Sequence, residues 1–227
     1  MSYRLALLLA FLVILALGCI DPYSVSDLLI EHALTVAALG LIVWLGWRRP
    51  LSNAAYTGLF LFLCIHVLGA KYTYSMVPYD RWAEALTGRT LNSVFGWERN
   101  HYDRLVHFCF GLLCLPAVLE ELEHRARVRG VWAIVLAAAV MNSLSTGYEL
   151  LEWLLTMVVA PEQAELYNGQ QGDVWDAHKD TGLATLGAVI AAAGVAAWRI
   201  GRGRRGREGA GGAPGREAGR YNAGSNP

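Results

Sequence analysis

The chain has 227 residues, of which 55% are hydrophobic and only 17% charged, and it contains eight tryptophans. This composition excludes an ordinary soluble domain and favours an integral membrane protein. The four cysteines all lie within apolar runs, which argues against a disulfide framework or a thiolate zinc site.

Six apolar segments approach the roughly 20 residues that a helix needs to cross about 30 Å of hydrocarbon. They cover residues 5–20, 28–47, 55–77, 103–119, 131–159 and 181–199. We therefore predict an all-α integral membrane fold, a six-helix transmembrane bundle formed by residues 1–199. The first segment is short, and the sequence leaves open whether it is cleaved; we favour a retained helix because five further spans follow.

Residues 200–227 are rich in glycine and arginine and show no helical periodicity. Segments of this composition cannot bury enough apolar surface to fold. We expect a disordered tail after the last span.

The arginines are segregated along the chain, and this segregation sets the predicted orientation. Thirteen of the nineteen basic residues gather at the N-terminus (Arg4), after the second apolar segment (Arg48, Arg49), after the fourth (residues 125–129) and in the tail. Six crossings would bring these four regions to one side, which the positive-inside rule assigns to the cytoplasm. We predict that both termini are cytoplasmic and that these arginines contact anionic lipid head groups.

Three aspartates stand at the outer end of the last predicted span, in "GDVWDAHKDTG" (172–182). Asp173, Asp176 and Asp180 are spaced by three and four residues, so they would share one face of a helix and repel one another. One aspartate in a first helical turn is commonly a cap that the helix dipole favours. Three on one face fit a cap less well and predict a positively charged counterpart.

The two preceding spans carry ionisable residues at the same outer level. Glu149 and Glu152 follow a polar stripe in "MNSLSTGYELLEW" (141–153), and Asp103 and His107 share a face in "RNHYDRLVHFCFG" (99–111), with Arg104 alongside. Ionisable groups inside a membrane are costly and by default mark a functional site. We predict that the fourth, fifth and sixth spans join these side chains in one pocket below the external leaflet.

Oxygen and imidazole ligands without thiolate suit Zn, Mn, Mg or Fe rather than a soft metal. A divalent cation would also remove the repulsion among the carboxylates. The candidate metal ligands are His107, Glu152, Asp173, Asp176 and Asp180. The candidate catalytic residues are Glu149 and Asp103 as acid–base groups and Arg104 as the partner of an anionic head group.

The blocks at 99–111 and 147–153, together with "GQQGDVWDAHKDTGLATLGA" (169–188), resemble those of the YjdF-type inner-membrane family. The resemblance implies a six-helix protein of a bacterial inner membrane and carries no activity with it. The chain departs from the family pattern at Ala184, where an asparagine is expected. A weaker likeness to VanZ-like membrane proteins rests on the arrangement of Glu149, Asp180 and Gly187.

Three functions fit these features. The first is a metal-assisted enzyme acting on a lipid or cell-envelope substrate at the extracytoplasmic face. The second is a small proton-coupled transporter with Glu149, His107 and His66 as relay groups, although His66 alone is better read as a hydrogen-bonded core histidine. The third is a structural or assembly protein whose polar layer is a buried ion-pair network.

Small residues line the last span, including Gly187, Ala191 and Gly194. Such residues let helices approach closely, either within the bundle or between the two copies of a homodimer. We favour packing within the bundle. The lipid bilayer is the expected partner, and we expect no nucleic acid.

Overall fold

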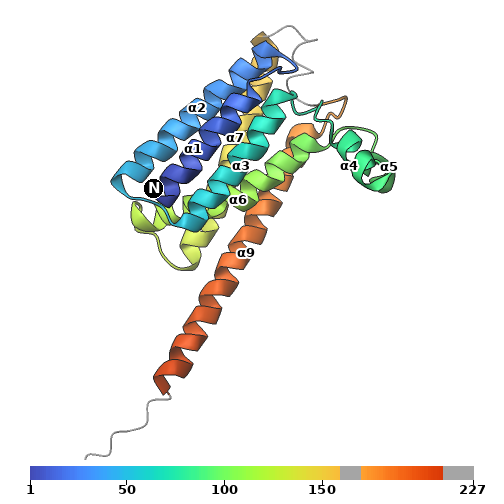
Figure 1. Cartoon of the computed structure of the whole chain (residues 1–227). Coiled ribbons are helices and arrows are strands. Elements are labelled where there is room, and N and C mark those ends of the chain that lie inside the picture. The colour runs from blue at the N-terminus through green and yellow to red at the C-terminus, as the bar shows by residue number, and fades with distance from the viewer. Residues whose placement is uncertain (159–169, 212–227) are drawn as a thin grey trace, which may run out of the picture.

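The computed structural model describes residues 1–158 and 170–211, and in these ranges it contains helices and no strand. The helices are α1 (Tyr3–Gly18), α2 (Val25–Arg48), α3 (Asn53–Lys71), α4 (Tyr79–Thr87), α5 (Leu91–Phe95), α6 (Tyr102–His124), α7 (Val131–Val158) and α9 (Asp176–Gly211) (Figure 1). Five of them, α2, α3, α6, α7 and α9, are long and apolar enough to cross a membrane. The prediction of an all-helical protein with several membrane spans is confirmed.

Helix α1 is apolar but has only 16 residues, a length of roughly 24 Å at 1.5 Å per residue. Its partner is α3, against which it packs through Phe11, Leu63 and Val67. A sixth crossing by α1 therefore stays a prediction.

Serine caps begin the first three helices. Ser2, Ser24 and Ser52 each accept a hydrogen bond from the backbone N–H three residues on. A serine before an apolar run is a common helix start because its hydroxyl satisfies one of the free N–H groups of the first turn.

Three spans end several residues away from the predicted boundary, and one of them is α6, which ends at His124 rather than at residue 119. Helix α3 ends at Lys71 rather than at residue 77, because Thr73 and Tyr74 adopt positive φ angles (47° and 52°) that turn the chain. Helix α9 begins at Asp176 and continues past the predicted boundary at residue 199 to Gly211. Residues 212–227 lie outside the described residues, so the disordered tail stays a prediction there.

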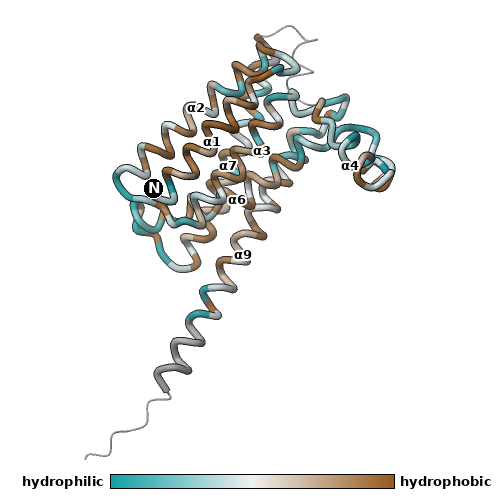
Figure 2. Tube along the Cα trace, viewed as in Figure 1, coloured by the Kyte–Doolittle hydropathy of each residue, from teal (hydrophilic) through white to brown (hydrophobic). Residues whose placement is uncertain are grey.

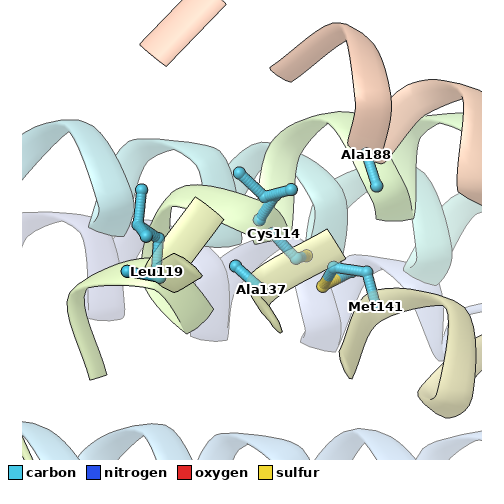
Figure 3. Close-up of a cluster of buried hydrophobic side chains, with 7 residues drawn as sticks. Cys114, Leu119, Ala137, Met141 and Ala188 are labelled. Atoms are coloured by element: carbon cyan, nitrogen blue, oxygen red, sulfur yellow. The ribbon is translucent and has the colours of Figure 1, made fainter. Parts of the chain in front are cut away.

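Helix α6 is the centre of the bundle and packs against α3, α7 and α9. One buried core cluster joins α6, α7 and α9 through Cys114, Leu115, Leu119, Ala133, Ala137, Met141 and Ala188 (Figure 3). Its small side chains allow the three helices to lie close together, which is how helices associate in lipid.

The α6–α9 crossing is the closest backbone approach in this core. A Cβ atom on Gly111 would lie 1.9 Å from the carbonyl oxygen of Ala184, and one on Gly187 would lie 2.2 Å from that of Phe108. Only glycine fits at these two positions. Gly187 therefore serves packing within the bundle, whereas a Cβ on Gly194 would meet nothing within 4 Å. The homodimer stays a prediction.

The outward surfaces of the long helices are apolar, as expected for contact with lipid. Leu29, Val36 and Trp44 on α2 are each more than half exposed, and hydrophobic residues extend along the bundle helices in Figure 2. A soluble protein of this size rarely exposes so much contiguous apolar surface.

Candidate functional site

The α6–α9 crossing brings three ionisable residues together. Two of them lie on α6, one and two turns before Gly111. Asp103 and His107 lie on successive turns of α6, and Asp180 faces them from α9. One potential ligand atom from each lies within 4.8 Å of the other two, and all three residues are buried. This set, which we call the triad cluster, is the group within the described residues whose donor atoms are close enough to hold a metal ion.

Helix α7 completes the surroundings of His107. The imidazole Nε2 lies 3.3 Å from Glu149 Oε1 and 3.7 Å from Asp103 Oδ1, while Nδ1 lies 3.5 Å from the hydroxyl of Ser145. Glu152 follows one turn further along α7 and is also buried. The structure thus brings Asp103, His107, Glu149 and Asp180 from three helices into one layer.

Two of the predicted metal ligands lie instead in an ion-pair group above this layer. Asp176 Oδ1 lies 2.6 Å from Arg99 Nη1 and 3.3 Å from Arg104 Nη2. Asp173, in the turn before α9, lies 2.5 Å from both Arg104 Nη2 and Lys179 Nζ. The three aspartates therefore divide between two environments, since Asp180 alone joins the triad cluster.

The ion-pair group holds the Asp173 carboxylate firmly in its charged form. Its pKa is lowered to about 2, chiefly by the hydrogen bond from Lys179, with further contributions from the Trp175 backbone N–H and from Arg104. This aspartate has cationic partners already, and so does Asp176.

The carboxylates below the ion pairs have no comparable compensation. Asp180 Oδ1 is buried and has no hydrogen-bond partner among the described residues, and Glu149 Oε1 is near only the His107 imidazole, at 3.3 Å. Residues 159–169 contain no lysine, arginine or histidine that would supply a base. Four acids, Asp103, Glu149, Glu152 and Asp180, thus gather around His107, and such a group needs protons or a cation.

A cleft of about 440 Å³ between α7 and α9 reaches this layer. Glu149, Glu152 and Asp176 line it together with Thr146, Thr181 and His178. Deeper in the same contact, Thr185 donates a 2.6 Å hydrogen bond to Asn142 Oδ1. The polar stripe predicted on the fifth span therefore faces α6 through Ser145 and Glu149 and α9 through Asn142. Glu149 also lines the cleft.

A second buried polar group, centred on α2, was missed from the sequence. Glu31 is 2% exposed and accepts hydrogen bonds of 3.3 Å from the hydroxyls of Tyr74 and Tyr148. The Tyr74 hydroxyl lies 2.6 Å from His66 Nδ1, and Thr35 Oγ1 lies 2.7 Å from His66 Nε2. The expectation that His66 is a hydrogen-bonded core histidine is confirmed.

The sequence does contain a feature that could have identified Glu31: it is an acidic residue within an apolar span, and such a residue needs a partner. The aromatic ring of Tyr148 also contacts that of His107, with centroids 5.9 Å apart. The Glu31 group and the triad cluster are thereby adjacent parts of one polar layer. Arg99 is the other residue that the sequence analysis missed. It lies three positions before α6, in a loop, where no helical periodicity marks its role.

Several apolar spans around a buried layer of carboxylates and histidines define a multi-pass integral membrane protein. Residues 3–201 match the family model described as predicted membrane protein (DUF2238). The chain is also 33% identical over 162 residues to the inner membrane protein YjdF of Escherichia coli (strain K12), a match that covers 71% of this chain and 73% of the relative. The chain belongs to this family of predicted membrane proteins. No solved structure matches it.

Proposed function

We propose that the chain is a six-span protein of a bacterial inner membrane with both termini in the cytoplasm. The relative from Escherichia coli is named an inner membrane protein. In Figure 1 the start of α1 lies at the same end of the bundle as the α2–α3 and α6–α7 turns. This is the end at which α1 must start if α1 crosses the membrane and successive spans run in opposite directions. Arginines occur in all three of these regions, where they would contact anionic lipid head groups.

The triad cluster, in this proposal, binds a divalent cation. The observation that carries it is the excess of buried carboxylates around a single histidine, with Asp180 Oδ1 lacking a hydrogen-bond partner among the described residues. Removing a charge from water without a partner is expensive, and a cation held by oxygen and imidazole donors offsets that cost. The donor types suit Zn, Mn, Mg or Fe.

The bound cation would serve an enzyme that acts on a lipid or cell-envelope substrate at the outer face. Glu149 borders both His107 and the cleft, which suits an acid–base group in contact with substrate. Arg104 has one guanidinium nitrogen, Nε, buried and without a hydrogen-bond partner among the described residues. Because Nε is buried, an anionic head group would reach Arg104 by displacing an aspartate partner from the Nη atoms.

Metal analysis of the purified protein tests the proposal. The protein is prepared in detergent without a polyhistidine tag, and its metal content is measured by mass spectrometry for the wild type, Asp180→Asn and His107→Gln. We expect a stoichiometric divalent metal in the wild type and its loss in both variants. Glu84→Gln, at an exposed site on α4, is the matched control and should retain the metal.

Thermal unfolding with and without chelator adds a readout that does not depend on activity. In chelator, Asp180→Asn should be more stable than the wild type, because it removes a buried carboxylate that lacks a compensating partner. With Zn or Mn the order should reverse, because only the wild type gains the cation's binding energy. The proposal of a cation site would be contradicted if the wild type contained no metal and its unfolding temperature did not change when divalent ions were added.

A structural role for the polar layer is the second candidate, and one observation favours it. Arg99, Arg104 and Lys179 already neutralise Asp173 and Asp176 and join the start of α6 to the start of α9. In this alternative Glu149→Gln would alter stability equally with and without metal. Under the cation proposal, the effect of the same variant depends on the ion.

A further inference from the structure

The hairpin formed by α4 and α5 exposes large apolar side chains. Leu86 is 86% exposed, Phe95 60%, Val94 49% and Trp82 43%. These residues lie outside the membrane-spanning helices, so the lipid that covers the bundle does not by itself account for them. Exposed apolar patches of this kind mark an interaction surface.

Helix α4 is amphipathic, with its apolar residues gathered on one side. At 100° per residue, Trp82 and Leu86 fall on one face, whereas Arg81 and Glu84 fall on the opposite face. A short helix of this pattern, with tryptophan on its apolar side, is typical of segments that lie in the plane of a membrane interface.

The position of the hairpin fits such an interface. The hairpin connects the end of α3 to the start of α6, and both helices are candidate membrane spans. In Figure 1 it extends sideways from the bundle at the level where α6 and α9 begin. An apolar face held at the ends of the spans meets the head-group region, where tryptophan and other aromatic residues are enriched.

Hydrogen bonds fix the hairpin to the segment that leads into α6. The Tyr79 hydroxyl donates to Asn92 Oδ1 at 2.9 Å and accepts from the His101 backbone N–H at 2.8 Å. Asn92 Nδ2 donates to the carbonyl oxygen of Arg99 at 3.2 Å. The hairpin is therefore a rigid extension of the backbone that carries Arg99, rather than a free loop.

We propose that the α4–α5 hairpin is a membrane-interface anchor whose apolar side chains, Trp82, Leu86, Val94 and Phe95, insert into the head-group region of the adjoining leaflet. The partner is the lipid surface, which continues from the apolar flank of the bundle to the underside of the hairpin. The anchor holds the Arg99 segment at a fixed height over the membrane. It does not depend on whether the triad cluster binds a cation.

Nitroxide labels on the full-length chain in phospholipid nanodiscs test the anchor. One label replaces Leu86 and a second replaces Glu84, the matched control on the polar face of the same helix. Electron paramagnetic resonance then compares collisions with oxygen, which concentrates in lipid, and with a water-soluble nickel chelate. The four native cysteines are replaced by alanine; if that chain fails to fold, a ketone-bearing amino acid carries the label in the wild-type background.

We expect the Leu86 label to favour oxygen several-fold over nickel and the Glu84 label to show the reverse. Nickel access at both positions would overturn the proposal, because the hairpin would then stand in water. A Leu86 label shielded from both reagents would overturn it in favour of a protein partner, such as a second copy of the chain.

Discussion

Asp173 and Asp180 show how differently two aspartates seven positions apart in one block can be used. Asp173 lies within 2.5 Å of an arginine and of a lysine nitrogen, whereas Asp180 is 1% exposed with one oxygen unpartnered among the described residues. Cationic neighbours stabilise the ionised form, and burial alone penalises it. The first residue thus acts in an ion pair, and the second requires a proton or a cation.

The Asp173 pairs predict a specific dependence of stability on pH. The folded pKa of about 2 lies below the ordinary value of 3.8, so the folded state binds a proton less readily than the unfolded state. The stabilisation is complete above the ordinary pKa and is lost as pH falls towards 2. Asp173→Asn should therefore lower the unfolding temperature near neutral pH, with no change in this difference down to about pH 5.

Thermal unfolding in detergent over a pH series measures this difference. It should shrink only below about pH 4, where the unfolded carboxyl group becomes protonated. Asp80→Asn is a suitable control, since Asp80 accepts a hydrogen bond from the Asn92 backbone and lies in the hairpin. A difference that disappears already between neutral pH and pH 5 would be at odds with the pairing described here.

Much of the site was predictable at the residue scale, because charges inside apolar spans stand out in a sequence. Asp103, His107, Glu149 and Asp180 were all expected in one layer, and they meet there. The division of the three aspartates was not predictable, since it depends on Arg99, which belongs to a loop whose path has no periodic pattern. Glu31 was overlooked although its neighbourhood is as apolar as that of Glu149.

At the scale of helices, the α6–α9 crossing decides whether the site exists. Gly111 and Gly187 let the two backbones touch, and this contact sets Asp103 and His107 opposite Asp180. Ala184, at the position where an asparagine was expected, is fully buried beneath Gly111. The atom of Ala184 that Gly111 approaches is the backbone carbonyl oxygen.

Gly111→Ala should therefore destabilise the fold and disturb the triad cluster together. The added methyl would lie 1.9 Å from a backbone oxygen, so the helices must separate, and overpacking of this kind costs roughly 1–3 kcal/mol. The measurement is the unfolding temperature, with metal content as the second readout. Gly194→Ala, on α9, is the control, because its Cβ would meet nothing within 4 Å and alanine favours helix. Equal effects of the two substitutions would show that the crossing is not as tight as described.

Element boundaries were less predictable than the elements themselves. Hydropathy located the long helices, since each needs enough apolar residues to cross the bilayer. It extended the third span to residue 77, because Tyr74, Met76 and Val77 are apolar although the backbone turns at Thr73. It also gave no warning of α4 and α5, which are too short to produce a hydropathy signal.

For the whole molecule, the arrangement of charges makes the two ends of the bundle unequal. The ion pairs, the polar layer and the hairpin gather where α6 and α9 begin. The opposite end carries Arg4, Arg48, Arg49 and the arginines after α6. Because positively charged loops are retained in the cytoplasm, the candidate site should face the periplasm.

Reporter fusions expressed in bacteria test this orientation. Alkaline phosphatase, which is active only after export, should be active when fused after Asp21 or Gly88 and inactive when fused after Arg127. Green fluorescent protein, which fluoresces only in the cytoplasm, should fluoresce at the C-terminus. Sequencing the N-terminus of the mature protein should find α1 retained, because a cleaved α1 would remove Phe11 from its contacts with Leu63 and Val67 on α3. Phosphatase activity after Arg127 would reverse the orientation, and the polar layer would then face cytoplasmic rather than envelope substrates.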